Sequence, residues 1–394
     1  MNVTEQAIIT LLRSAVTGEK LALPENVDMD FLIRVVARHM VVPMAYIGAV
    51  NCGVDKEHPV MEKLFRGYCH HLMTSEAQLR MLDSVFAAFD ANKIDYMPVK
   101  GCNLKQLYPK PELRPMGDGD ILIRMEQYDT IRPIMEGLGF RERIESDHEL
   151  IWQTPELFLE LHKRLIPSYN TDYYAYYGDG WRLAKVRNGT RYAMTDEDQF
   201  IYLFTHLSKH YRDGGIGLRH VTDLWVYLQA HPELDQTYIR SELKKLSLLA
   251  FYENMYRVLE AWFADGEWDE RTQLITGFVF GSGPWGTAEA HTASSIIKKA
   301  KKTGSLAKGK WQWFWRMIFP DVEEMSYKYP AVKKVPVLLP VFWVVRWVHT
   351  LLFRKAVVRG RRQDIKNFSQ EKIRKYKTQM EYVGLGFNFG EEEA

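Results

Sequence analysis

Two aspartates stand at the start of an apolar run in the stretch LRPMGDGDILIR, residues 113–124. One glycine separates Asp118 from Asp120, and three aliphatic residues follow directly. Because successive side chains of a β-strand point to opposite faces, both carboxylates are expected on one face, roughly 6–7 Å apart at the backbone. Two unpaired carboxylates this close repel each other unless they share a proton or bind a cation. The stretch therefore predicts half of a metal site beside a buried strand.

A third carboxylate for this site is found in ELFLELHKRL, residues 156–165. Glu160 and His162 share one face of a strand here, while leucines occupy the other face. If this strand lies beside the aspartate strand, Glu160 reaches the same site. Three carboxylates suit Mg²⁺ or Mn²⁺, with phosphate oxygens completing the coordination. His162 is expected to orient a carboxylate or a substrate, the alternative being a packed histidine.

Such a site could support in-line phosphoryl or nucleotidyl transfer, with two ions roughly 3.5–4 Å apart holding the attacking and leaving oxygens. The third carboxylate could also help to deprotonate the incoming hydroxyl. The alternative is that these acids are ordinary strand-end residues. The surrounding pattern favours the metal site, because a strand–glycine–helix unit precedes the pair and an acid follows on a later strand.

The order of elements predicts an α+β fold with a small mixed sheet and helices packed on it. Apolar spacing of helical type marks residues 4–17, 29–50 and 59–89. The next elements are expected in the order strand 96–101, helix 103–108, strand 113–124, a helix from residue 126 to Gly137 or Gly139, and two antiparallel strands at 141–154 and 156–165. Helical spacing returns from about residue 195. The expected parts are an N-terminal helical cap (1–92), an α/β catalytic core (93–190), a helical domain (191–280) and a basic, aromatic C-terminal helical region (281–394).

Composition narrows the partners and the compartment. The formal net charge of +2 gives no reason to expect a nucleic-acid partner. The three cysteines, Cys52, Cys69 and Cys102, are scattered and form no CxxC pair, which is typical of a protein in a reducing cytoplasm. The first 16 residues lack the features of a signal peptide. We therefore expect a cytoplasmic protein.

The C-terminal third combines apolar and basic segments. Residues 335–353 form the most apolar window, and residues 354–380 carry ten basic and two acidic side chains (10 − 2 = +8). The window is too short and too interrupted for a clear membrane span, which predicts a buried helix or one at a membrane surface. Residues 335–362 could thus contact the inner face of a membrane peripherally. Residues 280–295 are expected to form a loop, and the lysine-rich segment 298–310 to be exposed.

Three segments together resemble a known family. VKGCNLKQLYPKPELRPMGDGDILI, ELHKRL and HLSKHYRDGGIGLRHVTDLWVYL are similar to the uncharacterised bacterial nucleotidyltransferase family of the polymerase-beta-like superfamily. The resemblance implies a minimal nucleotidyltransferase sheet flanked by helical regions, and an NTP as substrate. Carried over by position, it implies that Asp118, Asp120 and Glu160 are metal ligands and that Gly101 lies at the nucleotide phosphates.

The phosphate turn departs from the wider superfamily, where Gly-Ser usually precedes a helix. Here the turn reads Lys100-Gly101-Cys102, and the helix N-terminus still presents N–H groups to an anion. Lys100 could supply a charge in place of the hydroxyl, or be a solvated lysine. Cys102 is expected to bind the nucleotide as part of this turn, as a small buried residue rather than a nucleophile.

The loop before the aspartate pair contributes two further candidates. Arg114 could neutralise phosphates or pair with Asp118, and the pair is favoured. Gly117 is expected at the nucleotide.

Downstream helical residues supply candidates of a second kind. His206, Lys209 and His210 could face the triphosphate or the acceptor, as could Arg219. The segment HLSKH lacks the glutamate of HExxH, which excludes a zinc protease. Asp223 is expected to form a local ion pair with Arg219, four residues before it.

The sequence thus predicts an Mg²⁺- or Mn²⁺-dependent nucleotidyltransferase that moves NMP from an NTP to a hydroxyl or phosphate. The acceptor would be a small molecule or a protein. Two alternatives are a non-catalytic nucleotide-binding or membrane-surface adaptor and a metal-dependent phosphodiesterase or nuclease.

Overall fold

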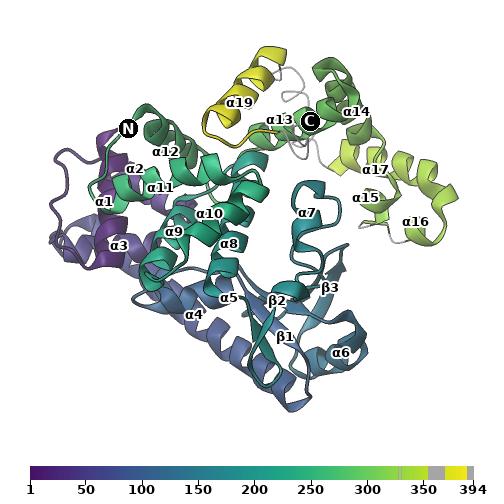
Figure 1. Ribbon diagram of the computed structural model, residues 1–394, viewed down its shortest axis with the longest axis horizontal. Helices are drawn as coiled ribbons and strands as arrows, with labels where there is room; N and C mark the ends of the chain where they lie inside the picture. The colour runs from purple at the N-terminus through teal and green to yellow at the C-terminus, as the bar shows by residue number, and fades with distance from the viewer. Residues whose placement is uncertain (327, 330, 354–368, 388–394) are drawn as a thin grey trace. The chain divides into compact units, whose positions relative to one another are not determined.

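The computed structural model describes residues 1–326, 328–329, 331–353 and 369–387, which divide into two compact units (Figure 1). The first unit comprises residues 1–210 and 215–285, and the second comprises residues 211–214 and the described residues from Gly286 onward. The finer four-part division expected from the sequence stays a prediction.

Helices supply most of the first unit. They are α1 (Val3–Thr17), α2 (Met29–Arg38), α3 (Val42–Asn51), α4 (Pro59–Ala91), α5 (Gly101–Leu104), α6 (Tyr128–Gly137), α7 (Thr171–Tyr177), α8 (Asp196–Asp213), α9 (Leu218–Ala230), α10 (Gln236–Lys245), α11 (Leu249–Phe263) and α12 (Glu270–Ser282). The last residues of α8 belong to the second unit.

The helical stretch expected at residues 29–50 is in fact two helices, α2 and α3. The break lies at Met40, which adopts a left-handed φ of 57°. His39 stabilises the break, because its Nδ1 accepts a hydrogen bond from the Leu218 N–H at 3.2 Å and its Nε2 donates to the Phe280 carbonyl at 3.2 Å. These partners are distant in sequence, so apolar spacing alone did not reveal the break.

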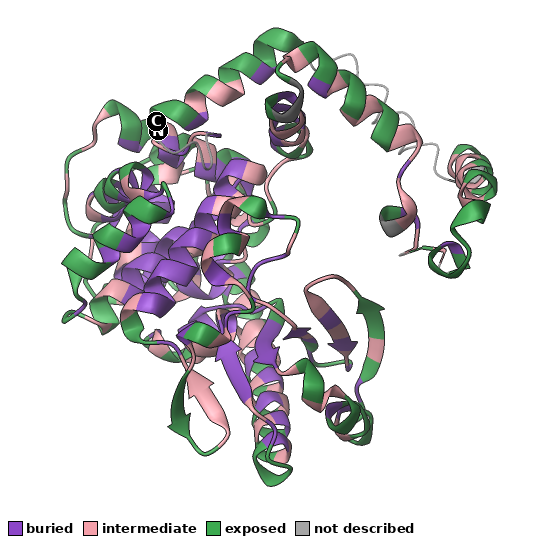
Figure 2. Cartoon of the chain, turned by 45° about the vertical axis from the view of Figure 1, so that its right-hand side comes forward, coloured by how far each residue is buried: buried purple, intermediate pink, exposed green. Residues whose placement is uncertain are grey.

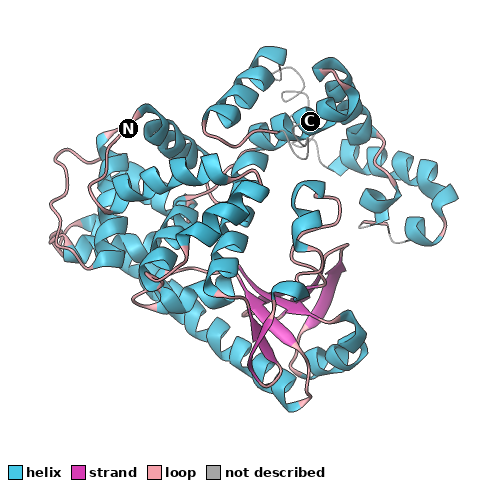
Figure 3. Cartoon of the chain, in the orientation of Figure 1, coloured by secondary structure: helices cyan, strands magenta, loops and turns pink. Residues whose placement is uncertain are grey.

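Among the described residues, seven strands form one mixed sheet in the order β3-β4-β5-β2-β1-β7-β6 (Figure 3). The strands are β1 (Tyr96–Val99), β2 (Asp118–Ile123), β3 (Arg141–Glu145), β4 (Glu149–Gln153), β5 (Phe158–His162), β6 (Lys185–Asn188) and β7 (Arg191–Ala193). The mixed α+β class expected from the sequence is therefore confirmed.

The sheet contains more strands than predicted. Residues 141–154, expected as one strand, form the hairpin β3–β4, whose turn is held by hydrogen bonds around Ser146. The hairpin β6–β7 was missed altogether. All four residues of β6 are exposed, so this edge strand lacks the apolar alternation by which a half-buried strand is recognised.

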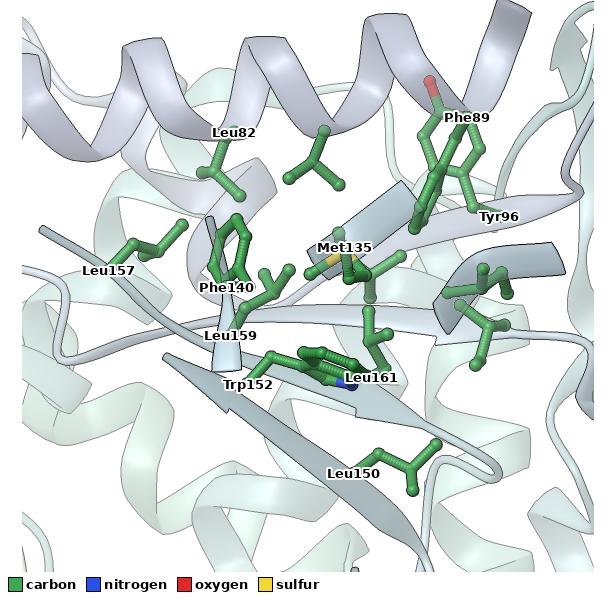
Figure 4. Close-up of a cluster of buried hydrophobic side chains, with 14 of the residues drawn as sticks. Leu82, Phe89, Tyr96, Met135, Phe140, Leu150, Trp152, Leu157, Leu159 and Leu161 are labelled. Carbon is green, nitrogen blue, oxygen red and sulfur yellow. The ribbon is translucent and has the colours of Figure 1, made fainter. Parts of the chain in front are cut away.

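One face of the sheet is apolar and carries the core of the α/β part. Figure 4 shows Leu82 and Phe89 of α4 above Trp152, Leu159 and Leu161 of the sheet. These five side chains are at most 3% exposed, and burying each contributes roughly 1.5–3 kcal/mol. The opposite face is left for Asp118, Asp120, Glu160 and His162, which alternate with these apolar residues.

Gly119, between the two aspartates, points towards the core. A Cβ at this position would lie 3.0 Å from Leu159 Cδ1 and 3.3 Å from Leu82 Cδ2. A larger residue would therefore push α4 away from the sheet beneath the acid pair. The glycine of the DGD segment is explained by packing.

The second unit is helical in its described part and contains α13 (Ala288–Thr303), α14 (Leu306–Ile318), α15 (Val322–Ser326), α16 (Ala331–Lys334), α17 (Leu339–Phe353) and α19 (Gln370–Tyr382). Figure 2 draws these helices mostly in the colours of intermediate and exposed residues, whereas buried residues gather in the first unit. No helix in the described ranges has both the length and the apolar character needed to cross a bilayer.

The loop expected at residues 280–295 was wrong, whereas the exposure expected for residues 298–310 holds in part. Residues 280–295 belong mostly to α12 and α13, with only residues 283–287 between them, and the lysine-rich segment 298–310 lies mostly in α13 and α14. The small residues that suggested a loop are packing residues. A Cβ at Gly309 of α14 would lie 2.6 Å from the Ala300 nitrogen of α13, so the glycine allows close approach of the two helices.

Candidate active site

The predicted acidic residues converge on two neighbouring strands. β2 and β5 pair in parallel, with Asp120 opposite Glu160 and Leu122 opposite His162. Asp118 is exposed at the beginning of β2, whereas Asp120 is only 3% exposed. The strand adjacency that the sequence analysis required is therefore present.

Asp120 is the centre of a compact network of charges. Its Oδ1 accepts hydrogen bonds from Lys100 Nζ at 2.6 Å and from His162 Nε2 at 2.8 Å. The same His162 nitrogen lies 3.5 Å from Glu160 Oε2. His162 thus bridges the carboxylates of the two strands, as expected for an orienting residue.

Lys100 takes up an unusual backbone conformation to reach this network. Its φ is 47°, in the left-handed region that a residue with a side chain rarely adopts. The turn joins β1 to α5, and the Lys100 side chain is only 17% exposed. The lysine is therefore paired with Asp120 rather than freely solvated.

The network strongly perturbs its own protonation. Burial would raise the pKa of Asp120, but the charge of Lys100 and the hydrogen bond from His162 outweigh it and hold that pKa below its ordinary range. Burial acts to lower the pKa of Lys100, yet the charge of Asp120 holds it well above the ordinary value.

Glu160 responds in the opposite direction. Burial and the negative charge of Asp120 raise the pKa of Glu160 to about 9. The polar face therefore contains more carboxylate than its own cations neutralise, and a bound cation would favour the ionised form of Glu160.

Two residues of the site were missed at the sequence level, His148 and Glu149. Glu149 lies on β4 directly opposite His162, and His148 Nε2 is 2.9 Å from Glu149 Oε2. The motif DHELIW contained the signal, because Glu149 alternates with buried Leu150 and Trp152. Splitting residues 141–154 into a hairpin would have placed Glu149 on the polar face.

Among the described residues, two groups of donors are compact enough to hold a metal ion. One is Asp120, Glu160 and His162, and the other is His148, Glu149 and His162, with donor atoms within 4.8 Å of one another in each. His162 belongs to both. Its Nδ1 is buried without a hydrogen-bond partner in the part of the chain that the structure describes.

Arg114 does not pair with Asp118, contrary to expectation. Its Nε donates to Asp223 Oδ1 at 2.7 Å and its Nη2 to Asp223 Oδ2 at 3.0 Å. The Tyr108 hydroxyl donates to the same Oδ1 at 2.7 Å. A two-pronged guanidinium–carboxylate contact is stronger than the single contact available at the strand end, so Arg114 anchors the loop before β2 to α9.

The expected local ion pair between Asp223 and Arg219 was also wrong. Arg219 Nη1 instead donates to the Pro115 carbonyl at 2.6 Å. Both arginines therefore hold the RPMG segment in place, one through a carboxylate and the other through the backbone.

The turn residues around Gly101 are closely packed. A Cβ on Gly101 would lie 3.1 Å from Arg114 Nη1 and 3.2 Å from Met116 Cγ. Cys102 packs on the apolar core, and burial raises the pKa of its thiol to about 12. This protonated, packed thiol fits the expected structural role. Gly117 is exposed, with open space where a Cβ would stand.

His206, Lys209 and His210 all lie on α8. The Nε2 atoms of His206 and His210 are 3.1 Å apart, and their ring centroids 4.4 Å. Burial, the charge of His210 and the positive charge of Lys100 all lower the pKa of His206. Because Lys100 acts on His206, α8 approaches the polar face of the sheet. A contact of these residues with substrate stays a prediction.

The mixed sheet thus places an aspartate pair on one strand beside a glutamate on its parallel neighbour. A family model described as "Uncharacterised nucleotidyltransferase" matches residues 25–264, and the chain belongs to this family. The resemblance to an uncharacterised nucleotidyltransferase family, inferred from the motifs, is thereby confirmed.

More distant comparisons add little. A solution structure of the antibiotic-resistance factor ANT(2'')-Ia is 14% identical, covers 48% of this chain and 97% of that chain, and has a TM-score of 0.32. A likeness at that TM-score carries no weight in assigning activity. No curated protein sequence matches the chain.

Proposed function

We propose that the protein transfers a nucleoside monophosphate from an NTP to a hydroxyl or phosphate of a small molecule or protein, with Mg²⁺ or Mn²⁺. The observation that carries this proposal is the direct pairing of Asp120 with Glu160 on parallel strands. Membership of a nucleotidyltransferase family supports the reaction class.

The residues present fit a bound cation. Glu160 has a raised pKa beside Asp120, and donor atoms of Asp120, Glu160 and His162 lie within 4.8 Å of one another. Asp118 and Asp120 would hold the ions, and Glu160 would hold the one nearest the acceptor. Bound there, the ions would neutralise charge on the transferred phosphate. A histidine nitrogen in the donor set makes Mn²⁺ as suitable as Mg²⁺.

In the proposed reaction the acceptor oxygen forms a bond to the α-phosphorus of the NTP. The bond from that phosphorus to the bridging oxygen of the β-phosphate breaks, and pyrophosphate leaves. The proton of an acceptor hydroxyl passes to a carboxylate oxygen of Glu160. In-line attack requires both oxygens to be held in position, which the rigid β2–β5 pair provides.

Lys100 and the turn that follows would hold the phosphates. The Lys100 ammonium already lies 2.6 Å from Asp120 Oδ1, at the edge of the acid group. When a cation replaces Lys100 as the partner of Asp120, the ammonium would neutralise a phosphate oxygen. The backbone N–H groups of Gly101 and Cys102 would donate to the same phosphates, and Gly117 leaves open space beside the acids for the nucleotide.

The test incubates purified protein with each α-labelled NTP, Mg²⁺ or Mn²⁺, and a cell extract as the source of acceptors. Pyrophosphate release and labelled products are followed together. The isosteric double variant Asp118→Asn/Asp120→Asn is expected to abolish both signals. Asp129→Asn, an exposed acid on α6, is the matched control and should retain them.

The outcomes separate the alternative activities. Label transfer with stoichiometric pyrophosphate supports the proposal. Hydrolysis of a phosphodiester without pyrophosphate would indicate a phosphodiesterase instead. Nucleotide binding without turnover, under conditions where Mn²⁺ binding is demonstrated, would indicate a non-catalytic binding protein.

A further inference from the structure

Helix α17 exposes a continuous row of aliphatic side chains, which we call the valine face. Its members are between 44 and 58% exposed and comprise Val341, Val344, Val345, Val348 and Leu351, and Val337, 81% exposed, precedes the helix. From Val341 onward the spacing of three and four residues places them on one side of the helix. An exposed row of this length is unusual for a helix that meets only water.

The opposite side of α17 points into its own unit. Trp343 Nε1 donates to the Pro320 carbonyl at 2.8 Å, and Trp347 Nε1 donates to the Ile318 carbonyl at 2.9 Å. Arg346 Nη1 donates to the Met317 carbonyl at 3.2 Å. These three hydrogen bonds fix the helix on the segment that ends α14.

Helix α17 is apolar on both sides, because Trp343 and Trp347 on its inward side pack against Phe319, with ring centroids 5.0 and 5.1 Å apart. A surface helix normally buries its apolar stripe and exposes its charged side. Here the hydrogen bonds of two tryptophans and an arginine hold the aliphatic side outward. An outward aliphatic side costs free energy in water, so a partner that covers it would be favoured.

The charge around the valine face specifies the kind of partner. Lys333 and Lys334 of α16 are exposed just before α17. The described residues from Met325 to Phe353 include no aspartate or glutamate, and Lys328 in the same stretch is also exposed. A second copy of the chain would bring two such basic surfaces together, and like charges repel. Anionic lipid would satisfy both the lysines and the aliphatic side chains.

We propose that the valine face, with Lys333 and Lys334, docks the protein on an anionic membrane surface. The helix lies along the interface, with its aliphatic side among the acyl chains and the lysines at the headgroups. The hydrogen bonds to the Met317–Pro320 carbonyls present the valine face without rearrangement. This proposal is independent of the transfer reaction.

The experiment measures co-sedimentation of the full chain with vesicles of phosphatidylcholine alone or mixed with phosphatidylglycerol. We expect binding to the mixed vesicles and far weaker binding to phosphatidylcholine. Val344→Asp/Val348→Asp should lower the partition coefficient by roughly tenfold or more, because a charge replaces buried aliphatic surface. Lys333→Gln/Lys334→Gln should lower it roughly fivefold per lysine, on anionic vesicles only.

Matched controls separate a specific face from general stickiness. Val186→Asp removes another exposed valine, 64% exposed on β6, and should leave vesicle binding unchanged. Asp118→Asn/Asp120→Asn should also bind vesicles normally, so a failure of the transfer reaction would not affect this result. Circular dichroism confirms folding, and Val341→Ser/Val348→Ser is the milder replacement if the aspartates unfold the second unit.

Two results would overturn the proposal. The first is equal binding, or no binding, to anionic and neutral vesicles by the unmodified chain. The second is concentration-dependent dimerisation in sedimentation velocity that Val344→Asp/Val348→Asp abolishes, in the absence of vesicle binding. That outcome would make the valine face a contact between two copies.

Discussion

Strand β5 and helix α17 place their aliphatic side chains in opposite ways. In β5 the leucines at 159 and 161 enter the core, while Glu160 and His162 gather with other charges on the far side. In α17 an aromatic side, held by indole and guanidinium hydrogen bonds, faces the protein, and an aliphatic side faces outward. Both arrangements are unfavourable without a partner. The carboxylates on the polar side of β5 repel one another, and the aliphatic side of α17 is exposed to water. Crowded carboxylates favour a bound cation, and exposed aliphatic side chains favour an apolar partner.

The largest effect is expected at Arg114, which anchors the loop before β2 to α9. Arg114→Ala leaves Asp223 buried without its guanidinium and should lower the free energy of unfolding by about 3–5 kcal/mol. Urea denaturation measures this loss. Arg66→Ala, which removes an exposed ion pair with Glu62, should cost no more than about 1 kcal/mol. Equal losses in both variants would contradict the anchoring role.

The next test removes one charge from the proposed cation site. Asp120→Asn keeps the shape of the side chain but should reduce the rate of NMP transfer by roughly 10²–10³-fold, because charge stabilisation in the transition state is lost. Steady-state kinetics at several Mn²⁺ concentrations measures the effect. Full activity at high Mn²⁺ would show that Asp120 only raises cation affinity.

A third test concerns His39, a buried residue with both ring nitrogens hydrogen-bonded, and its effect on the stability of the first unit. Burial lowers the pKa of His39 to about 4, against 6.5 for the unfolded chain. Since the unfolded chain binds the proton more readily, stability is retained above pH 6.5 and lost as pH falls towards 4. The loss attributable to His39 is on the order of 3 kcal/mol.

Thermal unfolding of His39→Gln across this pH range measures the contribution. The variant should be less stable at pH 7 but should lose less on acidification than the unmodified chain. An identical slope with pH in both proteins would assign the acid sensitivity to other groups.

The smallest effect on the free energy of unfolding is expected for a substitution on the valine face. Val348→Ser on the valine face should change the free energy of unfolding by no more than about 0.5 kcal/mol, because the side chain is half exposed. Leu161→Ala, on the core side of β5, should cost about 2–5 kcal/mol. Chemical denaturation of both variants would show whether the valine face contributes to folding or is kept for a partner.

The sequence allowed much of the site to be predicted because its signals are local. The DGD segment and ELFLELH reveal which residues share a face, and the strand–glycine–helix unit points to Gly101. The residues that were missed or misassigned depend on distant contacts. Glu149 joins the site only through a hairpin, and Arg114 meets Asp223 across more than 100 residues of chain.

Loop assignments failed for a related reason. Small residues in the segment 280–295 are typical of loops when judged by composition alone, and the lysines of residues 298–310 are typical of an exposed segment. Gly309 and the caps of α13 act instead as packing and terminating residues, since Thr287 accepts a hydrogen bond from the Ala290 N–H. Their role is visible only beside the neighbouring helix.

The sequence by itself determined which side chains of residues 118–123 and 156–165 share a face, because the alternation of a strand follows from covalent backbone geometry. Only the tertiary structure decided that these two strands are parallel neighbours, that Lys100 forms an ion pair with Asp120, and that α17 turns its aliphatic side outward. Those outcomes depend on which distant surfaces pack and which buried polar atoms find partners. Local spacing carries no information about that competition.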